Sequence, residues 1–237
     1  MSKKDKKQFP LTSKENCAIY LCRIISSCEL CMDRYKIYNK EAKLILEQYE
    51  GKDKIPYDIY SNICDKTGNV MCYILNLLGD CQSTSISYFK YRKQIQKLIN
   101  KGIDKIPLYS IDEKIENLLI DFNKMRNWQN HVPESLLVAE VELMKNGELK
   151  LSMNPMDIIH YNYVSYEYFA DLHDSNLNFY KAARKLIQSA KKDYSLLMDS
   201  KVSYPRQYSD TPVKLNKSEP AKMSAKIQGI KGSLDDE

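Results

Sequence analysis

The chain has 237 residues, of which 43% are hydrophobic and 28% are charged, and its formal net charge is +5. This length and composition allow one large domain with a buried core and a solvated surface, or one domain with a tail. No stretch approaches the ~20 apolar residues of a transmembrane helix, which argues against a membrane protein. The basic N-terminus is followed by no apolar signal core, so we expect a cytoplasmic protein.

The cysteines all fall in the first third of the chain. Their odd number argues against a disulfide framework. One pair has the spacing of half a zinc site, but no second pair of ligands answers it, so we expect reduced thiols in a core and no metal or cofactor. The seven are Cys17, Cys22, Cys28, Cys31, Cys64, Cys72 and Cys81.

Two long helical regions open the chain. Apolar residues at helical spacing predict a helix over residues 13–50, with Ser13 as the N-cap. A second helical region follows over residues 56–102. Gly68 and Gly79 lie inside it, so this region is either two helices or one kinked helix.

A third helix is expected from Ser110, because Ser110 and Glu113 have the spacing of a capping box. Its buried stripe recurs every three or four residues. This helix must stop before Pro133, since proline disfavours helix in the residue that precedes it. The stripe consists of Ile111, Ile115, Leu118, Phe122 and Met125.

The period then changes to two around the dipeptide Asn146-Gly147, which is typical of a tight turn between strands. We therefore predict a β-hairpin over residues 138–153. Residues 134–145 are also compatible with a helix, and the pattern leaves that alternative open.

Asn154 and Pro155 resemble the start of a further helix, which we expect to continue to about Asp199. A break near residues 174–176 is left open. His160 and His173 lie in this helix without a simple ligand spacing, and we interpret both as core or surface residues. Basic residues near the helix end are interpreted as a solvated face rather than a phosphate site: Lys181, Arg184, Lys185, Lys191 and Lys192.

These elements predict a mainly α fold, a bundle of four or five long helices with one inserted hairpin. We expect a flexible basic N-terminus over residues 1–12 and a helical domain over residues 13–200. Residues 201–237 have little apolar periodicity, which is typical of a flexible tail.

One pattern carries chemistry. Arg126 and His131 stand five positions apart at the end of the third helix, and Asn127 follows the arginine. Cleavage of RNA without a metal needs a base for the ribose 2′-hydroxyl, a cation for the phosphate and an acid for the leaving oxygen. Histidine serves as base or acid near neutral pH, and arginine offers a forked cation that fits phosphate. Asparagine can orient the histidine or the phosphate through hydrogen bonds.

The Arg-x4-His motif, with a polar amide after the arginine and long helices on both sides, resembles that of the HEPN superfamily. These helical-bundle proteins include many ribonucleases. The resemblance covers roughly residues 13–200 and implies that Arg126, Asn127 and His131 are catalytic. Asn123, Lys124 and Asn130 lie beside the motif and are the expected substrate contacts.

Positions five apart on a straight helix lie about 140° apart, so Arg126 and His131 would not share one face. Either the helix unwinds before Pro133 or a second subunit completes the site. The resemblance implies a homodimer whose two motifs face a shared cleft. Trp128 is interpreted as a core or dimer contact rather than a base-stacking residue.

The sequence thus predicts a metal-independent endoribonuclease that binds RNA. The resemblance implies a toxin or phage-defence (abortive infection) effector, with a possible antitoxin or regulatory partner. A second interpretation is a non-cleaving helical module that binds RNA or a partner protein. A third is a structural scaffold in which the Arg-His pair is accidental.

Overall fold

The structure is a computed structural model that describes residues 9–102, 106–130, 134–147, 160–200 and 210. The chain divides into two units, residues 1–202 and residues 203–237, and the described helices and strands lie in the first. The predicted tail therefore lies outside the described residues, apart from Asp210.

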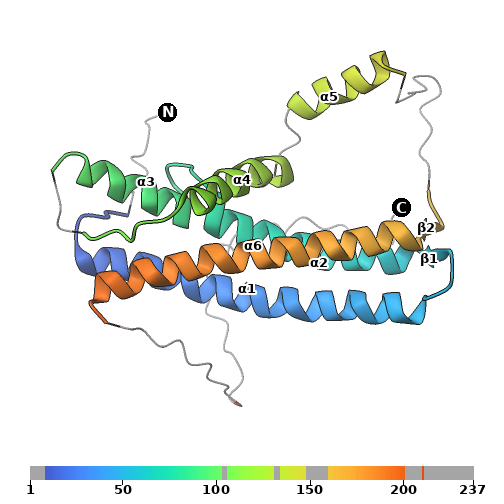
Figure 1. Ribbon diagram of the computed structural model, residues 1–237, viewed down its shortest axis with the longest axis horizontal. Coiled ribbons are helices and arrows are strands. Elements are labelled where there is room, and N and C mark those ends of the chain that lie inside the picture. The colour runs from blue at the N-terminus through green and yellow to red at the C-terminus, as the bar shows by residue number, and fades with distance from the viewer. Residues whose placement is uncertain (1–8, 103–105, 131–133, 148–159, 201–209, 211–237) are drawn as a thin grey trace, which may run out of the picture. The chain divides into compact units, whose positions relative to one another are not determined.

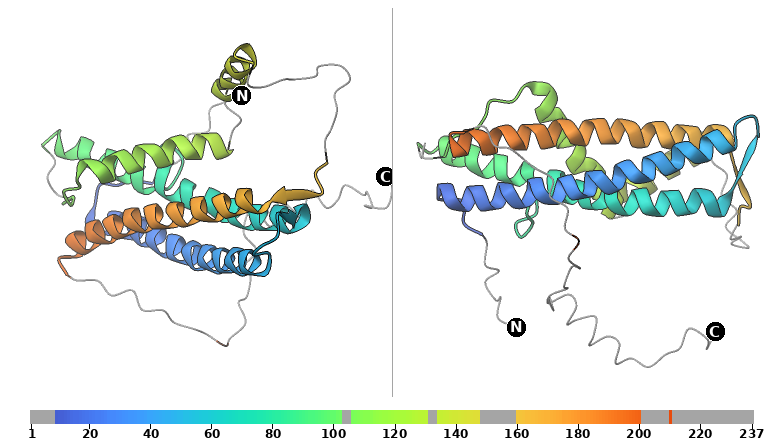
Figure 2. Two further views of the ribbon diagram at one scale, coloured as in Figure 1. Left: turned by 45° about the vertical axis from the view of Figure 1, so that its right-hand side comes forward. Right: turned by 90° about the horizontal axis from the view of Figure 1, so that it is seen from below.

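The fold is mainly helical, as predicted. The long helices α1, α2 and α6 lie side by side, α4 packs on α2 and α6, and α3 packs on α2 (Figure 1, Figure 2). In chain order the elements are α1 (Lys14–Gln48), β1 (Lys54–Pro56), α2 (Tyr57–Gly79), α3 (Tyr88–Ile99), α4 (Glu113–Asn130), α5 (Glu134–Lys145), β2 (Tyr163–Ser165) and α6 (Tyr166–Met198). None of these described helices has both the length and the apolar character to cross a membrane.

The first two helical regions begin and end close to where they were predicted. Ser13 caps α1 by accepting a hydrogen bond from the backbone N–H of Asn16 at 3.2 Å. The second region is two helices, because α2 ends at Gly79 and α3 starts only at Tyr88, where Ser87 is the N-cap. Gly68 lies within α2 without ending it.

The start of α4 corrects the predicted capping box. The helix begins at Glu113, and Asp112 holds its first turn by accepting a hydrogen bond from the backbone N–H of Ile115 at 2.8 Å. Ser110 instead belongs to the segment before the helix. An aspartate next to the first turn can accept from its free N–H groups, and its charge favours that end of the helix dipole.

The predicted hairpin over residues 138–153 is wrong in its first half. Residues 134–145 form the helix α5, which was the open alternative, while residues 148–153 lie outside the described part. The small antiparallel sheet pairs β1 with β2, so Ile55 lies opposite Val164. The hairpin was predicted from this alternation together with Asn146-Gly147, but alternating glutamates and apolar residues suit a helix surface as well as a strand.

The helix α6 resolves an alternative that the sequence left open, since it runs through residues 174–176 without a break. Asn176 is buried inside the helix, and its Oδ1 accepts a hydrogen bond from the Tyr35 hydroxyl of α1 at 2.8 Å. The polar residue therefore connects two helices instead of ending one. The helix starts at Tyr166 with Ser165 as N-cap, while Asn154 and Pro155 lie outside the described residues.

The core lies between α1, α2, α4 and α6. Phe122 of α4 stacks on Phe179 of α6, with ring centroids 5.2 Å apart. Cys17 and Cys28 are fully buried in this core, and all seven cysteines are free thiols. A smaller apolar cluster around Ile55 joins the sheet to the adjoining ends of the helices.

One face of α1 remains uncovered. Four large apolar side chains fall within about 40° of one another around this helix. Their exposed fractions are 59% to 68%. They are Ile19, Leu30, Ile37 and Leu44.

Candidate functional site

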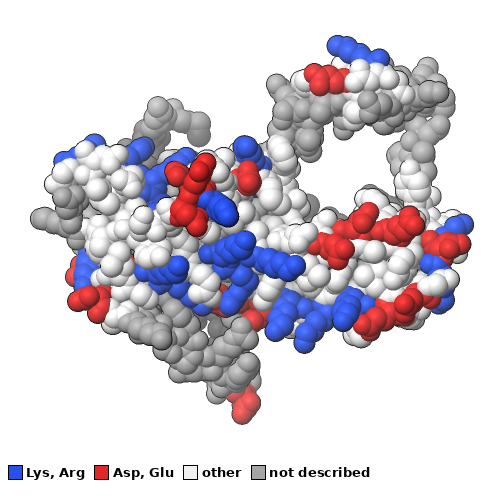
Figure 3. All heavy atoms as spheres, viewed as in Figure 1, with Lys and Arg blue, Asp and Glu red and all other residues white. Residues whose placement is uncertain are grey.

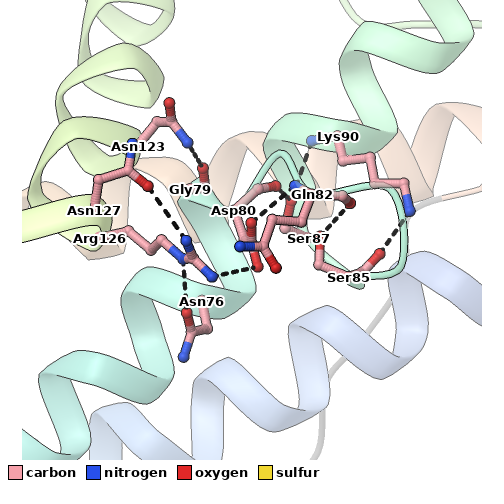
Figure 4. Close-up of polar contacts among 10 residues, drawn as sticks. All are labelled: Asn76, Gly79, Asp80, Gln82, Ser85, Ser87, Lys90, Asn123, Arg126 and Asn127. Carbon is pink, nitrogen blue, oxygen red and sulfur yellow. Dashed lines mark hydrogen bonds and ion pairs between the residues drawn. The ribbon is translucent and has the colours of Figure 1, made fainter. Parts of the chain in front are cut away.

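Arg126 lies near the end of α4 with only 8% of its surface exposed. Its guanidinium points at the C-terminal end of α2 (Figure 4). Nη2 contacts Asp80 Oδ2 at 3.2 Å, and Nε donates to Asn76 Oδ1 at 3.2 Å. Nη1 donates to Asn127 Oδ1 at 3.3 Å. With its amide oxygen turned toward the guanidinium, Gln82 accepts from Nη1 and Nη2 at 3.2 Å.

Asp80 reaches this position because α2 ends beside α4. A Cβ added at Gly79 would lie 2.6 Å from the backbone carbon of Phe122, so only glycine permits this approach of the two helices. Asn123 Nδ2 donates to the carbonyl oxygen of Gly79 at 2.7 Å, which ties α4 to the last turn of α2. Asn76 lies in the last turn of α2 and Asp80 follows the helix directly, so the end of α2 presents two acceptors to Arg126.

The connection from α2 to α3 is fixed by its own hydrogen bonds (Figure 4). Asp80 Oδ1 accepts from the backbone N–H of Gln82 at 2.9 Å, and the Ser87 hydroxyl donates to the carbonyl of Asp80. Lys90 Nζ donates to the carbonyl oxygens of Ser83 and Ser85 at 2.7 and 2.8 Å, and burial lowers its pKa. The partners of Arg126 are therefore held in place.

Chemically, this arrangement is a buried cation with every nitrogen engaged. One carboxylate and up to three amide oxygens surround a group that carries five N–H donors. A phosphate that bound Arg126 would have to displace Asp80 or one of the three amide oxygens. Asn127 is exposed, so its contact with Arg126 is more easily exchanged than that of Asp80.

The other residues in and beside the motif differ in their exposure and in their contacts. Lys124 is exposed and lies 3.9 Å from Asp121, while Asn123 is used to hold α2. Asn130 is the last residue of α4, and its side chain lies outside the described part. His131 follows it directly in the chain and also lies outside the described residues.

The structure corrects one part of the interpretation of Trp128. Its side chain is 55% exposed, so it is not a core residue of this chain. The remaining alternatives, a contact in a dimer or a stacking surface for a base, both need an exposed ring.

Asp80, Asn76 and Gln82 were not anticipated as partners of Arg126. The spacing of Asn76 and Asp80 places them on one helix face, but that spacing does not show which element they would meet. Within the described residues, no three side chains of His, Cys, Asp or Glu are grouped to hold a metal ion.

Comparison with known proteins adds no relative. No family model, no curated protein and no solved structure matches the chain.

Proposed function

We propose that this protein is a cytoplasmic, metal-independent endoribonuclease of HEPN type that acts as a toxin or phage-defence effector. His131 is the general base or acid, and Arg126 and Asn127 are its phosphate-binding and orienting neighbours. The observation that carries the proposal is the hydrogen bond between Arg126 and Asn127. It brings the motif's cation and amide together in the last turns of α4, with Asn127 four residues before His131 in the chain.

The proposed reaction needs no external reagent. A base removes the proton of the ribose 2′-hydroxyl, and the 2′-oxygen bonds to the adjacent phosphorus as the bond from phosphorus to the 5′-oxygen breaks. The departing oxygen takes a proton, so the products are a 2′,3′-cyclic phosphate and a 5′-hydroxyl end. Histidine suits either proton transfer, and a guanidinium stabilises the charge on the pentavalent phosphorus.

A homodimer is part of this proposal, because a second His131 would supply the acid that accompanies the base. Trp128 lies on α4 within the motif and is 55% exposed, so it is a surface available for a contact that brings the two motifs together. Light scattering tests this with Trp128→Glu. A dimer of the wild type that this variant splits supports the proposal, and a wild-type monomer contradicts the dimer.

The test of activity uses total RNA and purified protein in EDTA. The variants are His131→Ala, Arg126→Lys and Asn127→Ala, with Lys114→Ala as an exposed control on α4. We expect cleavage to 2′,3′-cyclic ends by the wild type and the control, and loss of at least about 100-fold for His131→Ala. Arg126→Lys keeps the charge but loses the fork, so a partial loss is expected. Equal cleavage by His131→Ala would contradict the assignment.

A second candidate function is favoured by one observation, the engagement of Arg126 by Asp80. A guanidinium neutralised by a neighbouring carboxylate is suited to holding two helices together. In that case the protein is a non-cleaving helical module that binds RNA, an antitoxin or another regulatory partner. RNA binding without any cleavage, in the wild type and in His131→Ala alike, distinguishes this function from the first.

A further inference from the structure

A pocket of about 480 Å³ lies between the segment before α4 and the C-terminal half of α6. Its volume falls in the range of sites that hold small organic ligands. Three cations line it, together with a tyrosine and two isoleucines. Six of its lining residues carry the argument: Tyr109, Ile111, Asp112, Arg184, Lys185 and Lys192.

One wall of the pocket is fixed from beneath by a buried ion pair. Arg92 Nη1 contacts Asp193 Oδ2 at 2.7 Å, and the Asp193 side chain is fully buried. The same pair holds the backbone of Tyr109 at both ends. Asp193 Oδ1 accepts from its N–H at 2.7 Å, and Arg92 Nη2 donates to its carbonyl oxygen at 2.9 Å. The backbone that carries the Tyr109 ring is therefore held in place.

The cations of the pocket are in excess of its acids. Glu29 of α1 pairs with Arg184 at 3.0 Å and with Lys191 at 2.5 Å, so a single carboxylate serves two cations. Lys192 Nζ lies 4.8 Å from the centre of the Tyr109 ring, and both Lys185 and Lys192 are exposed. Asp112 is the only acid among the lining residues.

The charge on this side of α6 changes sign along the helix. Lys181, Lys185 and Lys192 fall within about 40° of one another around the axis. Figure 3 shows Lys and Arg gathered over the C-terminal half of α6, and Asp and Glu over its N-terminal part. The acidic part of the same face carries Glu167, Asp171 and Asp174.

We propose that the pocket and the lysines of α6 bind a single-stranded RNA strand, with its phosphates at Lys185 and Lys192 and a base against Tyr109. The proposal rests on the proposed function, because it names a docking site for that substrate. Lys185 and Lys192 are two turns apart, about 10 Å along the axis. An aromatic ring beside a line of cations is the arrangement that binds single strands without sequence preference. An acidic peptide would have no base to stack on the ring.

The test measures binding of a labelled single-stranded RNA by fluorescence anisotropy, in the His131→Ala background. The main variant carries Lys185→Glu and Lys192→Glu, and the matched control carries Lys97→Glu and Lys101→Glu, which change the net charge equally. We expect the main variant to lose at least about tenfold in affinity. Its salt dependence should be less steep by about 1.4 in the logarithmic slope, about 0.7 for each lost phosphate contact. The control should lose less than about threefold.

Tyr109 supplies a second measurement. Tyr109→Phe keeps the ring and should bind RNA like the parent, whereas Tyr109→Ala should lose about fivefold or more, since stacking of one base contributes about 1–3 kcal/mol. Equal affinity in the lysine variant and its control would overturn the proposal. Adenosine monophosphate binding as tightly as RNA through the same lysines would overturn the strand as ligand in favour of a free nucleotide.

The result is separable from the proposed function. With His131 restored, the lysine variant should require more RNA for half-maximal cleavage while keeping its rate at saturating RNA. Binding that depends on the pocket in a protein that never cleaves would reject the nuclease and retain the docking site. Cleavage that does not respond to the lysine variant would do the reverse.

Discussion

Two buried arginine–aspartate pairs in the described part of the chain connect distant elements, and they are built differently. The Arg92–Asp193 contact is 2.7 Å long and the aspartate side chain is fully buried, whereas the Arg126–Asp80 contact is 3.2 Å long and that aspartate is 7% exposed. Asp193 also accepts from the Tyr88 hydroxyl at 2.6 Å. Arg126 is surrounded mainly by amide oxygens, at the ends of two helices.

The difference teaches what each pair is suited to do. Burial raises the pKa of Asp193, although Arg92 and the hydrogen bonds from Tyr88 and Tyr109 oppose this effect. An ion pair so excluded from water can exchange its partners only at a high cost in free energy. Amide contacts on a helix end are exchanged at a lower cost, so the Arg126 site is the one where a ligand can compete.

The largest expected effect is on the Arg92–Asp193 pair. Asp193→Ala would leave Arg92 buried without a counter-charge and would free the Tyr109 backbone, so we expect a loss of about 3–5 kcal/mol in the free energy of unfolding. Denaturant unfolding measures it, with exposed Asp171→Ala as control. A loss below about 1 kcal/mol would show that the pair contributes little.

A smaller loss is expected at the second pair. Arg126→Ala would leave Asp80 without its cation, but the backbone N–H of Gln82 still donates to that carboxylate. We expect a loss of about 1–3 kcal/mol in the same unfolding experiment. If Arg126→Ala destabilised the protein more than Asp193→Ala, the contrast between the two pairs would be refuted.

A pair of glycine substitutions sharpens the comparison at the helix end. Gly79→Ala places a Cβ 2.6 Å from the backbone of Phe122, which forces α2 and α4 apart and should cost about 1–3 kcal/mol. At Gly68 the nearest atom is 3.9 Å away, so Gly68→Ala should stabilise α2 by up to about 1 kcal/mol. Equal effects of the two substitutions, in thermal or denaturant unfolding, would disprove the tight approach.

The last expected effect appears only at alkaline pH, away from both pairs. Burial raises the pKa of Cys17 to about 11. The unfolded chain loses this proton near pH 9 and binds fewer protons above it, so stability is fully present below that pH and falls as pH rises toward about 11. Cys17→Val should make the decline shallower in urea unfolding under reducing conditions. An unchanged slope would exclude Cys17 as a cause.

The sequence predicted the individual helices better than the contacts between them. Ser13 and the apolar spacing predicted α1 because they are local signals, whereas Gly68 and Gly79 left open whether the second region is one helix or two. The hairpin failed because an alternation over a few residues does not distinguish a strand from a helix surface. Asp80 and Asp193 could not be assigned to Arg126 and Arg92, since no local pattern specifies a contact between distant parts of the chain. The sequence does not show which basic residues of α6 form ion pairs and which are exposed. They were therefore all interpreted as one solvated face.

The chain separation within each pair also orders their assembly. Asp80 and Arg126 are 46 positions apart, whereas Arg92 and Asp193 are 101 apart. Closing the longer loop costs about 0.7 kcal/mol more in chain entropy. During synthesis from the N-terminus, at about 5–20 residues per second, the ribosome releases Arg126 several seconds before Asp193. The motif can therefore be held by α2 while the nascent chain still lacks α6, the helix that anchors Tyr109 and carries the lysines.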